Sequence, residues 1–162
     1  MTTSALFHTQ GIRGFKYEKT HRKNGVEYYH VRSSAAHVDC PLCGSADTVI
    51  VKTAKTREIR GLHIGLKKTI LRVRIRRVLC SSCGKCPQEP ITFCAGPYLT
   101  YTKWLAKYVL ALRREMSISA VARFTGLHWE SVKEIEKTYL RKKYKKPHLG
   151  KVQYMGIDEV YL

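Results

Sequence analysis

Two short cysteine pairs constrain the fold of this chain more than any other feature of its sequence. They lie in residues 40–44 (CPLCG) and 80–84 (CSSCG). Two intervening residues let both thiolates of a pair point at one ion, and the following glycine relieves the tight turn. Two such knuckles supply the closed tetrahedral site that structural Zn²⁺ prefers. We therefore predict a zinc ribbon whose metal ligands are Cys40, Cys43, Cys80 and Cys83.

Two further cysteines leave alternatives open. Cys86 lies three residues after Cys83, so these two form another Cys-x-x-Cys pair and Cys86 competes for one ligand position. The glycine after Cys83 matches the one after Cys43, which favours Cys80 and Cys83 as the second knuckle. Cys94 has no such partner, and we predict that it is a small buried apolar residue. A redox pair fits poorly, because no thioredoxin-like βαβ pattern surrounds it.

The charge of the chain indicates the class of its partner. Thirty Lys and Arg residues against 12 Asp and Glu give a net charge of +18 over 162 residues. Such a charge favours a polyanion, and without a long apolar run or a basic amphipathic anchor a membrane is not expected. Residues 1–14 lack the apolar segment of a secretory signal. We therefore expect a cytoplasmic protein whose six cysteines stay reduced instead of forming disulfides.

The remaining patterns predict an α+β fold. Residues 15–32 indicate a hairpin around Asn24-Gly25, a dipeptide that suits a tight primed turn. Residues 71–76 alternate aliphatic side chains with arginines, which predicts a strand with one apolar face. After Pro90 the apolar spacing becomes helical and predicts helices over residues 101–112, 119–124 and 129–142.

The arginine strand and the last two helices are the candidate nucleic-acid contacts. Arginines on every second residue of a strand lie roughly 6.6 Å apart, close to the phosphate spacing of a duplex strand. The alternative is a solvated strand face. Residues 117–139 have the spacing of a helix-turn-helix around Gly126, and the alternative is a helical hairpin that only packs. The predicted DNA-binding residues are Arg72, Arg74, Arg76, Trp129, Lys133, Lys137, Arg141, Lys142, Lys143, Lys145 and Lys146.

Taken in order, these parts resemble the transposases of the ISL-three group of bacterial insertion sequences. The resemblance runs from about residue 30 through both knuckles and the helices to residues 154–159 (YMGIDE). It implies a zinc ribbon and a helix-turn-helix that recognise the terminal inverted repeats of the element. It also implies an RNase-H-like domain that cuts and joins DNA with an Asp-Asp-Glu triad and two Mg²⁺ ions. Asp158 matches the first catalytic aspartate of the family.

The expected organisation has four parts: an N-terminal β-hairpin segment (1–36), a zinc ribbon (37–95), a helix-turn-helix module (98–146) and a single-strand start of the catalytic domain (151–162). Asp158 and Glu159 are adjacent on a strand and point to opposite faces, so they cannot share an ion. The sequence ends before the second and third family carboxylates, which indicates a truncated transposase. We expect no strand cleavage by this polypeptide alone, and Mg²⁺ only in a complete catalytic domain.

Two hypotheses about partners follow. The first is double-stranded DNA carrying the inverted-repeat ends, together with an oligomer formed with full-length transposase. The second is that the chain is a zinc-ribbon RNA-binding or ribosome-associated protein. The helix-turn-helix pattern favours the first, because the deep, narrow major groove of RNA does not admit a reading helix.

Overall fold

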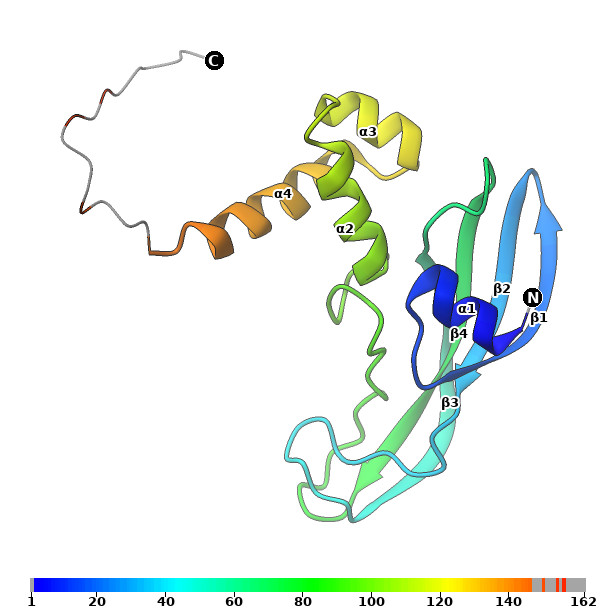
Figure 1. Ribbon diagram of the computed structural model, residues 1–162. Coiled ribbons are helices and arrows are strands. Elements are labelled where there is room, and N and C mark those ends of the chain that lie inside the picture. Colours follow the sequence, from blue (N-terminus) through cyan, green and yellow to red (C-terminus); the bar gives the residue numbers. More distant parts are fainter. Residues whose placement is uncertain (1, 147–149, 151–153, 155, 157–162) are drawn as a thin grey trace.

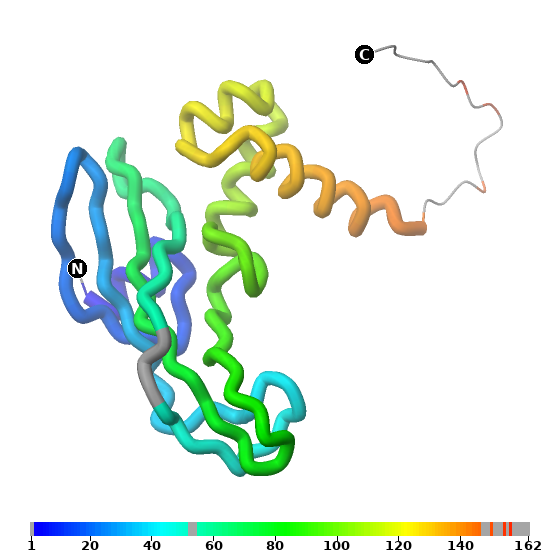
Figure 2. The backbone as a smooth tube through the Cα atoms, turned by 180° about the vertical axis from the view of Figure 1, so that it is seen from behind, coloured from blue at the N-terminus to red at the C-terminus, as the bar shows by residue number. Residues whose placement is uncertain are grey.

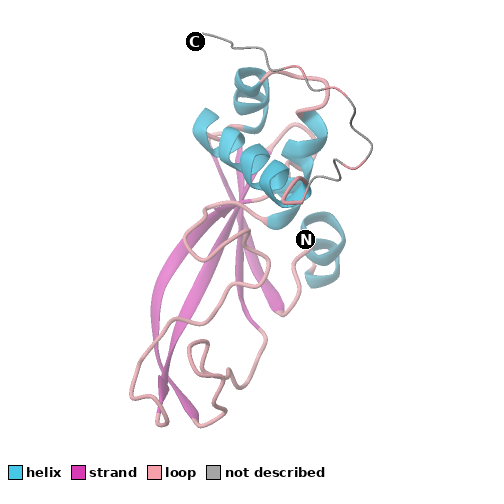
Figure 3. Cartoon of the chain, turned by 90° about the vertical axis from the view of Figure 1, so that its left-hand side faces the viewer, coloured by secondary structure: helices cyan, strands magenta, loops and turns pink. Residues whose placement is uncertain are grey.

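The computed structural model of the chain describes residues 2–146, 150, 154 and 156, without the side chains of residues 52–54. The described residues form a four-stranded sheet and four helices, which confirms the predicted α+β class. The strands are β1 (Phe15–Lys23), β2 (Val26–Ser33), β3 (Thr48–Arg60) and β4 (Lys68–Cys80). The helices are α1 (Thr3–Gln10), α2 (Lys103–Leu112), α3 (Ile118–Thr125) and α4 (Trp129–Lys143). Helix α1 lies against the sheet, whereas α2, α3 and α4 gather at one end of the strands (Figures 1 and 3).

The predicted N-terminal hairpin is confirmed as β1 and β2, which pair antiparallel. Both turn residues have positive φ, 50° for Asn24 and 73° for Gly25, as a two-residue primed turn requires. Strand β2 also pairs with β4, in parallel, so the sheet order is β1-β2-β4-β3. An isolated hairpin is only marginally stable in water, and this pairing gives it a larger sheet to join. The sheet therefore continues across the boundary expected between residues 36 and 37.

One face of the sheet is buried. The alternation predicted along β4 is confirmed, because Leu71, Val73 and Ile75 are at most 2% exposed. They share a core with Leu6 of α1 and with Phe93 in the segment before α2. Burying a side chain of this size contributes roughly 1.5–3 kcal/mol. This apolar face therefore fixes α1 to the sheet and leaves the arginines of β4 on the opposite face.

Helix α1 is the element that the sequence patterns do not predict, although its ends carry ordinary signals. Thr2 accepts a hydrogen bond from the Ala5 N–H at the start of the helix, and Gly11 follows its end with φ 67°. A threonine before a helix and a glycine after it are typical caps. Gly11 also lies against the Trp104 indole, which occupies the space that a Cβ at this position would need. The end of α1 thus contacts both the sheet and α2.

Gln10 connects α1 to the chain segment between β3 and β4. Its side-chain amide donates to the Leu62 carbonyl at 2.9 Å, and its side-chain carbonyl accepts from the Leu62 N–H at 2.8 Å. Gln10 is 1% exposed, so water does not reach these groups easily. Leu62 packs against the core of the helices in turn. Gln10 therefore holds a segment through which the sheet contacts the helical part.

Replacement of Gln10 with alanine is expected to lower the free energy of unfolding by roughly 2–4 kcal/mol, because both backbone groups of Leu62 lose their partner. Gln88→Ala is the matched control, since Gln88 is exposed. Urea unfolding of the two variants measures the difference. If both variants unfold at the same urea concentration, the Gln10 contact has no such role.

The three helices predicted after Pro90 are confirmed. Helix α2 begins at Lys103, two residues later than predicted, because Thr102 is its N-cap and accepts from the Leu105 N–H. Gly126, with φ 68°, ends α3 in the left-handed conformation. The helices bury a common core whose most buried members are Leu105, Val109, Val121 and Val132. None of the helices in the described part of the chain is long and apolar enough to cross a membrane.

Candidate metal centre and nucleic-acid interface

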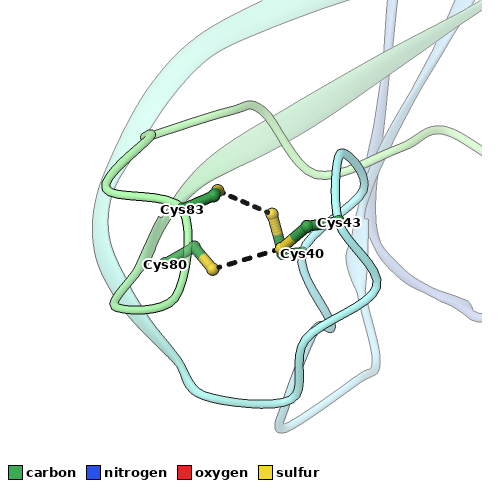
Figure 4. A group of neighbouring side chains, drawn as sticks. All are labelled: Cys40, Cys43, Cys80 and Cys83. Carbon is green, nitrogen blue, oxygen red and sulfur yellow. Dashed lines mark hydrogen bonds between the residues drawn. The ribbon is translucent and has the colours of Figure 1, made fainter.

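Four cysteines from two distant parts of the chain meet at the end of the β3–β4 hairpin. Cys40 and Cys43 lie in the loop before β3, Cys80 is the last residue of β4, and Cys83 lies in the following turn. Their sulfur atoms all lie within 4.8 Å of one another and point toward a common centre (Figure 4). Pairing of Thr48 with Cys80 at the end of the hairpin brings the two knuckles together.

The spacing of the sulfur atoms fits a tetrahedral zinc ion. The Sγ atoms of Cys40 and Cys83 are 3.7 Å apart, and those of Cys43 and Cys80 are 3.6 Å apart. A regular tetrahedron with Zn–S bonds of the usual length has sulfur–sulfur separations of roughly 3.8 Å. Four sulfur ligands in a closed arrangement are typical of structural zinc. The four cysteines that the sequence predicted as a set therefore support a structural Zn²⁺ ion.

The two knuckles have the same backbone hydrogen bonds. In the first, the Gly44 N–H donates to the Cys40 carbonyl at 2.8 Å, and the Cys40 N–H donates to the Ser45 carbonyl at 2.9 Å. In the second, the Gly84 N–H donates to the Cys80 carbonyl at 2.9 Å, and the Cys80 N–H donates to the Lys85 carbonyl at 3.0 Å. The glycines have φ of 75° and 64°, a conformation that other residues rarely adopt. The glycine after each pair is thus required by the turn.

Backbone N–H groups in the knuckles stabilise the thiolate form that binds a metal. The Cys43 N–H is the main group that lowers the pKa of Cys40, which falls to about 7. The Cys83 N–H likewise lowers the pKa of Cys80. The Ser45 N–H acts to lower the pKa of Cys43. The sulfurs of Cys40 and Cys80 nevertheless raise that pKa to about 12. A divalent cation would remove this repulsion between thiolates and allow all four sulfurs to bind as thiolates.

The other two cysteines have different surroundings. Cys86 lies outside the group of four, and its carbonyl accepts hydrogen bonds from the Arg77 guanidinium at 2.8 and 3.1 Å. Cys94 is 5% exposed, which confirms the prediction of a buried residue. Its thiol donates to the Leu99 carbonyl at 2.9 Å. The structure therefore places Cys86 beside the second knuckle and away from the convergent sulfurs.

The three arginines of β4 that are predicted to bind DNA share a face but differ in their partners. The Arg72 Nε donates to the Glu58 carboxylate at 2.8 Å on an exposed surface. Arg74 is exposed and forms no salt bridge within the part of the chain that the structure describes. Arg76 is held by the 7% exposed Glu89 carboxylate through two bonds of 2.7 Å, and its hydrogen bonds with Glu89 raise the pKa of Arg76. Contact of these arginines with DNA stays a prediction, and Arg74 is the most available of them.

Helix α4 presents a basic stripe to solvent. Its buried face carries Val132 and Ile135, whereas the side chains at every fourth position from its start are exposed. These are Trp129, Lys133, Lys137 and Arg141. The Lys133 ammonium lies 5.8 Å from the centre of the Trp129 ring, in cation–π geometry.

The end of α4 is also basic. Lys142 and Lys143 belong to its last turn, where the helix dipole favours cations, and Lys145 and Lys146 follow as exposed residues. A hydrogen bond with Tyr144 is the main cause of the raised pKa of Lys143. The predicted catalytic residue, Asp158, lies outside the described residues. DNA contact by this helix also stays a prediction.

Comparison with known proteins gives a family context for the cysteine region. The family model described as the zinc-finger of transposase IS204/IS1001/IS1096/IS1165 matches residues 37–83. The chain is also similar to the transposase for insertion sequence element IS1001 of Bordetella parapertussis. The two are 31% identical over 133 residues, which cover 82% of this chain and 32% of that protein. The chain thus spans about a third of the length of this relative. No solved structure matches the chain.

Proposed function

We propose that this chain is a DNA-binding part of an ISL-three transposase, because its residues 37–83 match the zinc-finger model of these transposases. In this proposal Cys40, Cys43, Cys80 and Cys83 hold a structural zinc ion that fixes the end of the β3–β4 hairpin. The partner is duplex DNA carrying the terminal inverted repeats of an insertion sequence. The observation that carries the proposal is the exposed basic stripe of α4 on a helical pair whose inner face is buried.

Features of α3 and α4 support the proposed helix-turn-helix. Ser117 caps the start of α3, Gly126 ends it, and α4 begins three residues later at Trp129. Val121 and Val132 are fully buried between the helices, which fixes their relative orientation. We propose that α4 is the reading helix and that Trp129 and Lys133 at its start contact base edges. Lys137 and the basic residues of the last turn would contact phosphates, which supply affinity without sequence choice.

We propose that catalysis requires a longer protein than this chain. Two-metal phosphoryl transfer needs several convergent carboxylates. Among the described residues, the one group of three or more potential metal ligands is the cysteine cluster. We propose that Asp158 acts with further carboxylates and Mg²⁺ in a complete transposase. We also propose that this chain can occupy element ends together with full-length transposase. These assignments rest on the family resemblance.

Duplex binding tests the proposed function. The zinc-loaded protein is expected to bind a duplex with the element's terminal inverted repeat at least tenfold more tightly than a scrambled duplex at matched salt. Equal affinities would contradict sequence recognition. Stronger binding to structured RNA than to either duplex would instead favour the RNA-binding hypothesis. The measurement is fluorescence anisotropy with labelled duplexes at several salt concentrations, because an affinity without its salt dependence is uninterpretable.

The stripe on α4 gives a residue-level prediction. The double variant Lys133→Ala/Lys137→Ala is expected to weaken duplex binding about tenfold or more, because it removes two cations from the proposed groove-facing surface. Lys103→Ala/Lys107→Ala removes the same charge from exposed positions of α2 and is the matched control. If both double variants lose affinity equally, only total charge matters and α4 is not the reading helix.

A further inference from the structure

We propose that Arg60 and Lys68 form a phosphate-binding site at the turn between α3 and α4. The site would hold a phosphodiester of the same duplex that α4 reads, so the inference rests on the proposed function and deepens it. The sequence patterns do not single out either residue as a contact. Arg60 is the last residue of β3, and Lys68 is the first residue of β4.

The charged ends of the Arg60 and Lys68 side chains lie close together beside Gly126. A Cβ built on Gly126 would lie 2.7 Å from the Arg60 Nη1 and 3.0 Å from the Lys68 Nζ. Gly126 is the left-handed residue that ends α3, so the two side chains from the sheet meet the helical part at its turn. Figures 1 and 2 place the β3–β4 connection beside this end of α3. Both nitrogens lie beside the backbone of Gly126, so they are close enough to each other to bind the oxygens of one phosphate group that approaches from solvent.

No acidic side chain neutralises this pair among the described residues. Arg72 and Arg76 on the same face of the sheet have Glu58 and Glu89, whereas Arg60 and Lys68 form no salt bridge within the described chain. Two like charges this close repel each other, so their attraction to one another cannot explain the arrangement. The C-terminal end of α3 at Gly126 attracts both cations, and a phosphate anion would reduce the repulsion that remains between them.

Backbone hydrogen bonds hold Arg60 in this position. The Arg60 N–H donates to the Thr100 carbonyl at 2.7 Å, and the Arg60 carbonyl accepts from the Thr102 N–H at 2.9 Å. Nearby, the His63 Nε2 lies 3.3 Å from the Thr125 carbonyl, which joins the β3–β4 connection to α3. Arg60 is therefore positioned before any ligand binds, and a phosphate would need little rearrangement of its backbone.

Two neighbouring features favour an anion at this place. Helix α4 begins just after the turn, and its N-cap His128 makes no side-chain cap hydrogen bond but lies 3.4 Å from the carboxylate of Glu130 in the first turn. The N-terminus of a helix of this length has a positive potential. The second feature is β4 itself, where Lys68, Arg72 and Arg74 share one face of the strand. The proposed site thus lies where the basic face of the sheet meets the start of the reading helix.

The test is the salt dependence of duplex binding by the zinc-loaded chain carrying Arg60→Gln/Lys68→Gln. Loss of one phosphate contact is expected to lower the slope of log K against log salt by about one. Affinity at low salt is expected to fall about tenfold or more. Lys16→Gln/Lys23→Gln removes the same charge from exposed positions of β1 and should keep a slope closer to that of the wild type.

The outcomes separate the two proposals. If the wild-type chain does not bind duplex DNA, the proposed function fails and this inference fails with it. If the wild type binds but Arg60→Gln/Lys68→Gln has the same slope and affinity as its control, the phosphate site alone is wrong. The double variant should also unfold at the same temperature as the wild type in the absence of DNA. A lower unfolding temperature would assign the pair a structural role and overturn the inference.

Discussion

Replacing Cys80 with serine is expected to abolish tight zinc binding, whereas Cys86→Ser should still bind one zinc ion per chain. Cys80 is fully buried within the group of four sulfurs, and Cys86 lies outside it. Structural zinc sites contribute about 10–16 kcal/mol of apparent binding free energy in zinc-finger peptides, so losing one of four thiolates lowers affinity by orders of magnitude. Zinc content after dialysis against a weak chelator measures the effect.

The two cysteine variants also decide between the alternatives at the second knuckle. Retention of zinc by Cys80→Ser with loss by Cys86→Ser would make Cys86 the ligand and contradict the geometry of the cluster. Loss of zinc should also loosen the end of the hairpin, because Cys80 pairs with Thr48 and the Ser81 N–H donates to the Asp47 carbonyl at 3.1 Å. Hydrogen exchange of these amides is expected to rise in Cys80→Ser and to stay unchanged in Cys86→Ser.

Replacing Glu89 with alanine is expected to lower the free energy of unfolding by roughly 3–5 kcal/mol, since it leaves the guanidinium of Arg76 without its partner in a mostly buried place. The side chains of Glu89 and Arg76 are 7% and 21% exposed. Arg76 also donates to the Ser33 hydroxyl and the Ala35 carbonyl, so the pair links β4 to the end of β2. Chemical denaturation of the zinc-loaded protein measures the loss.

Glu58→Ala is the matched control for this prediction. Glu58 of β3 pairs with Arg72 of β4, but the two side chains are 47% and 38% exposed. An exposed pair of this kind contributes at most about 1 kcal/mol, because water and salt screen it. Equal losses for Glu89→Ala and Glu58→Ala would show that burial does not distinguish the two pairs. The comparison also tests whether Arg76 is a structural residue or a residue available to DNA.

Local patterns in the sequence predict much of the fold. The Asn24-Gly25 dipeptide predicts the first hairpin, and the alternation from Leu71 to Ile75 predicts the buried face of β4. The apolar spacing after Pro90 predicts α2, α3 and α4 to within about two residues. These predictions succeed because each depends on residues that are close together in the sequence. Helix α1 is missed because it is short and has almost no apolar stripe, so only its caps mark it.

The cysteine knuckles show what the sequence by itself determined. Their spacing and glycines select Cys40, Cys43, Cys80 and Cys83, and the structure brings these four sulfurs together. The tertiary structure alone decided the parallel pairing of β2 with β4, the salt bridge that occupies Arg76 and the convergence of Arg60 and Lys68 on Gly126. The physical reason is distance along the chain. A periodic pattern fixes which face a side chain occupies, but its partner across that face depends on how remote segments pack.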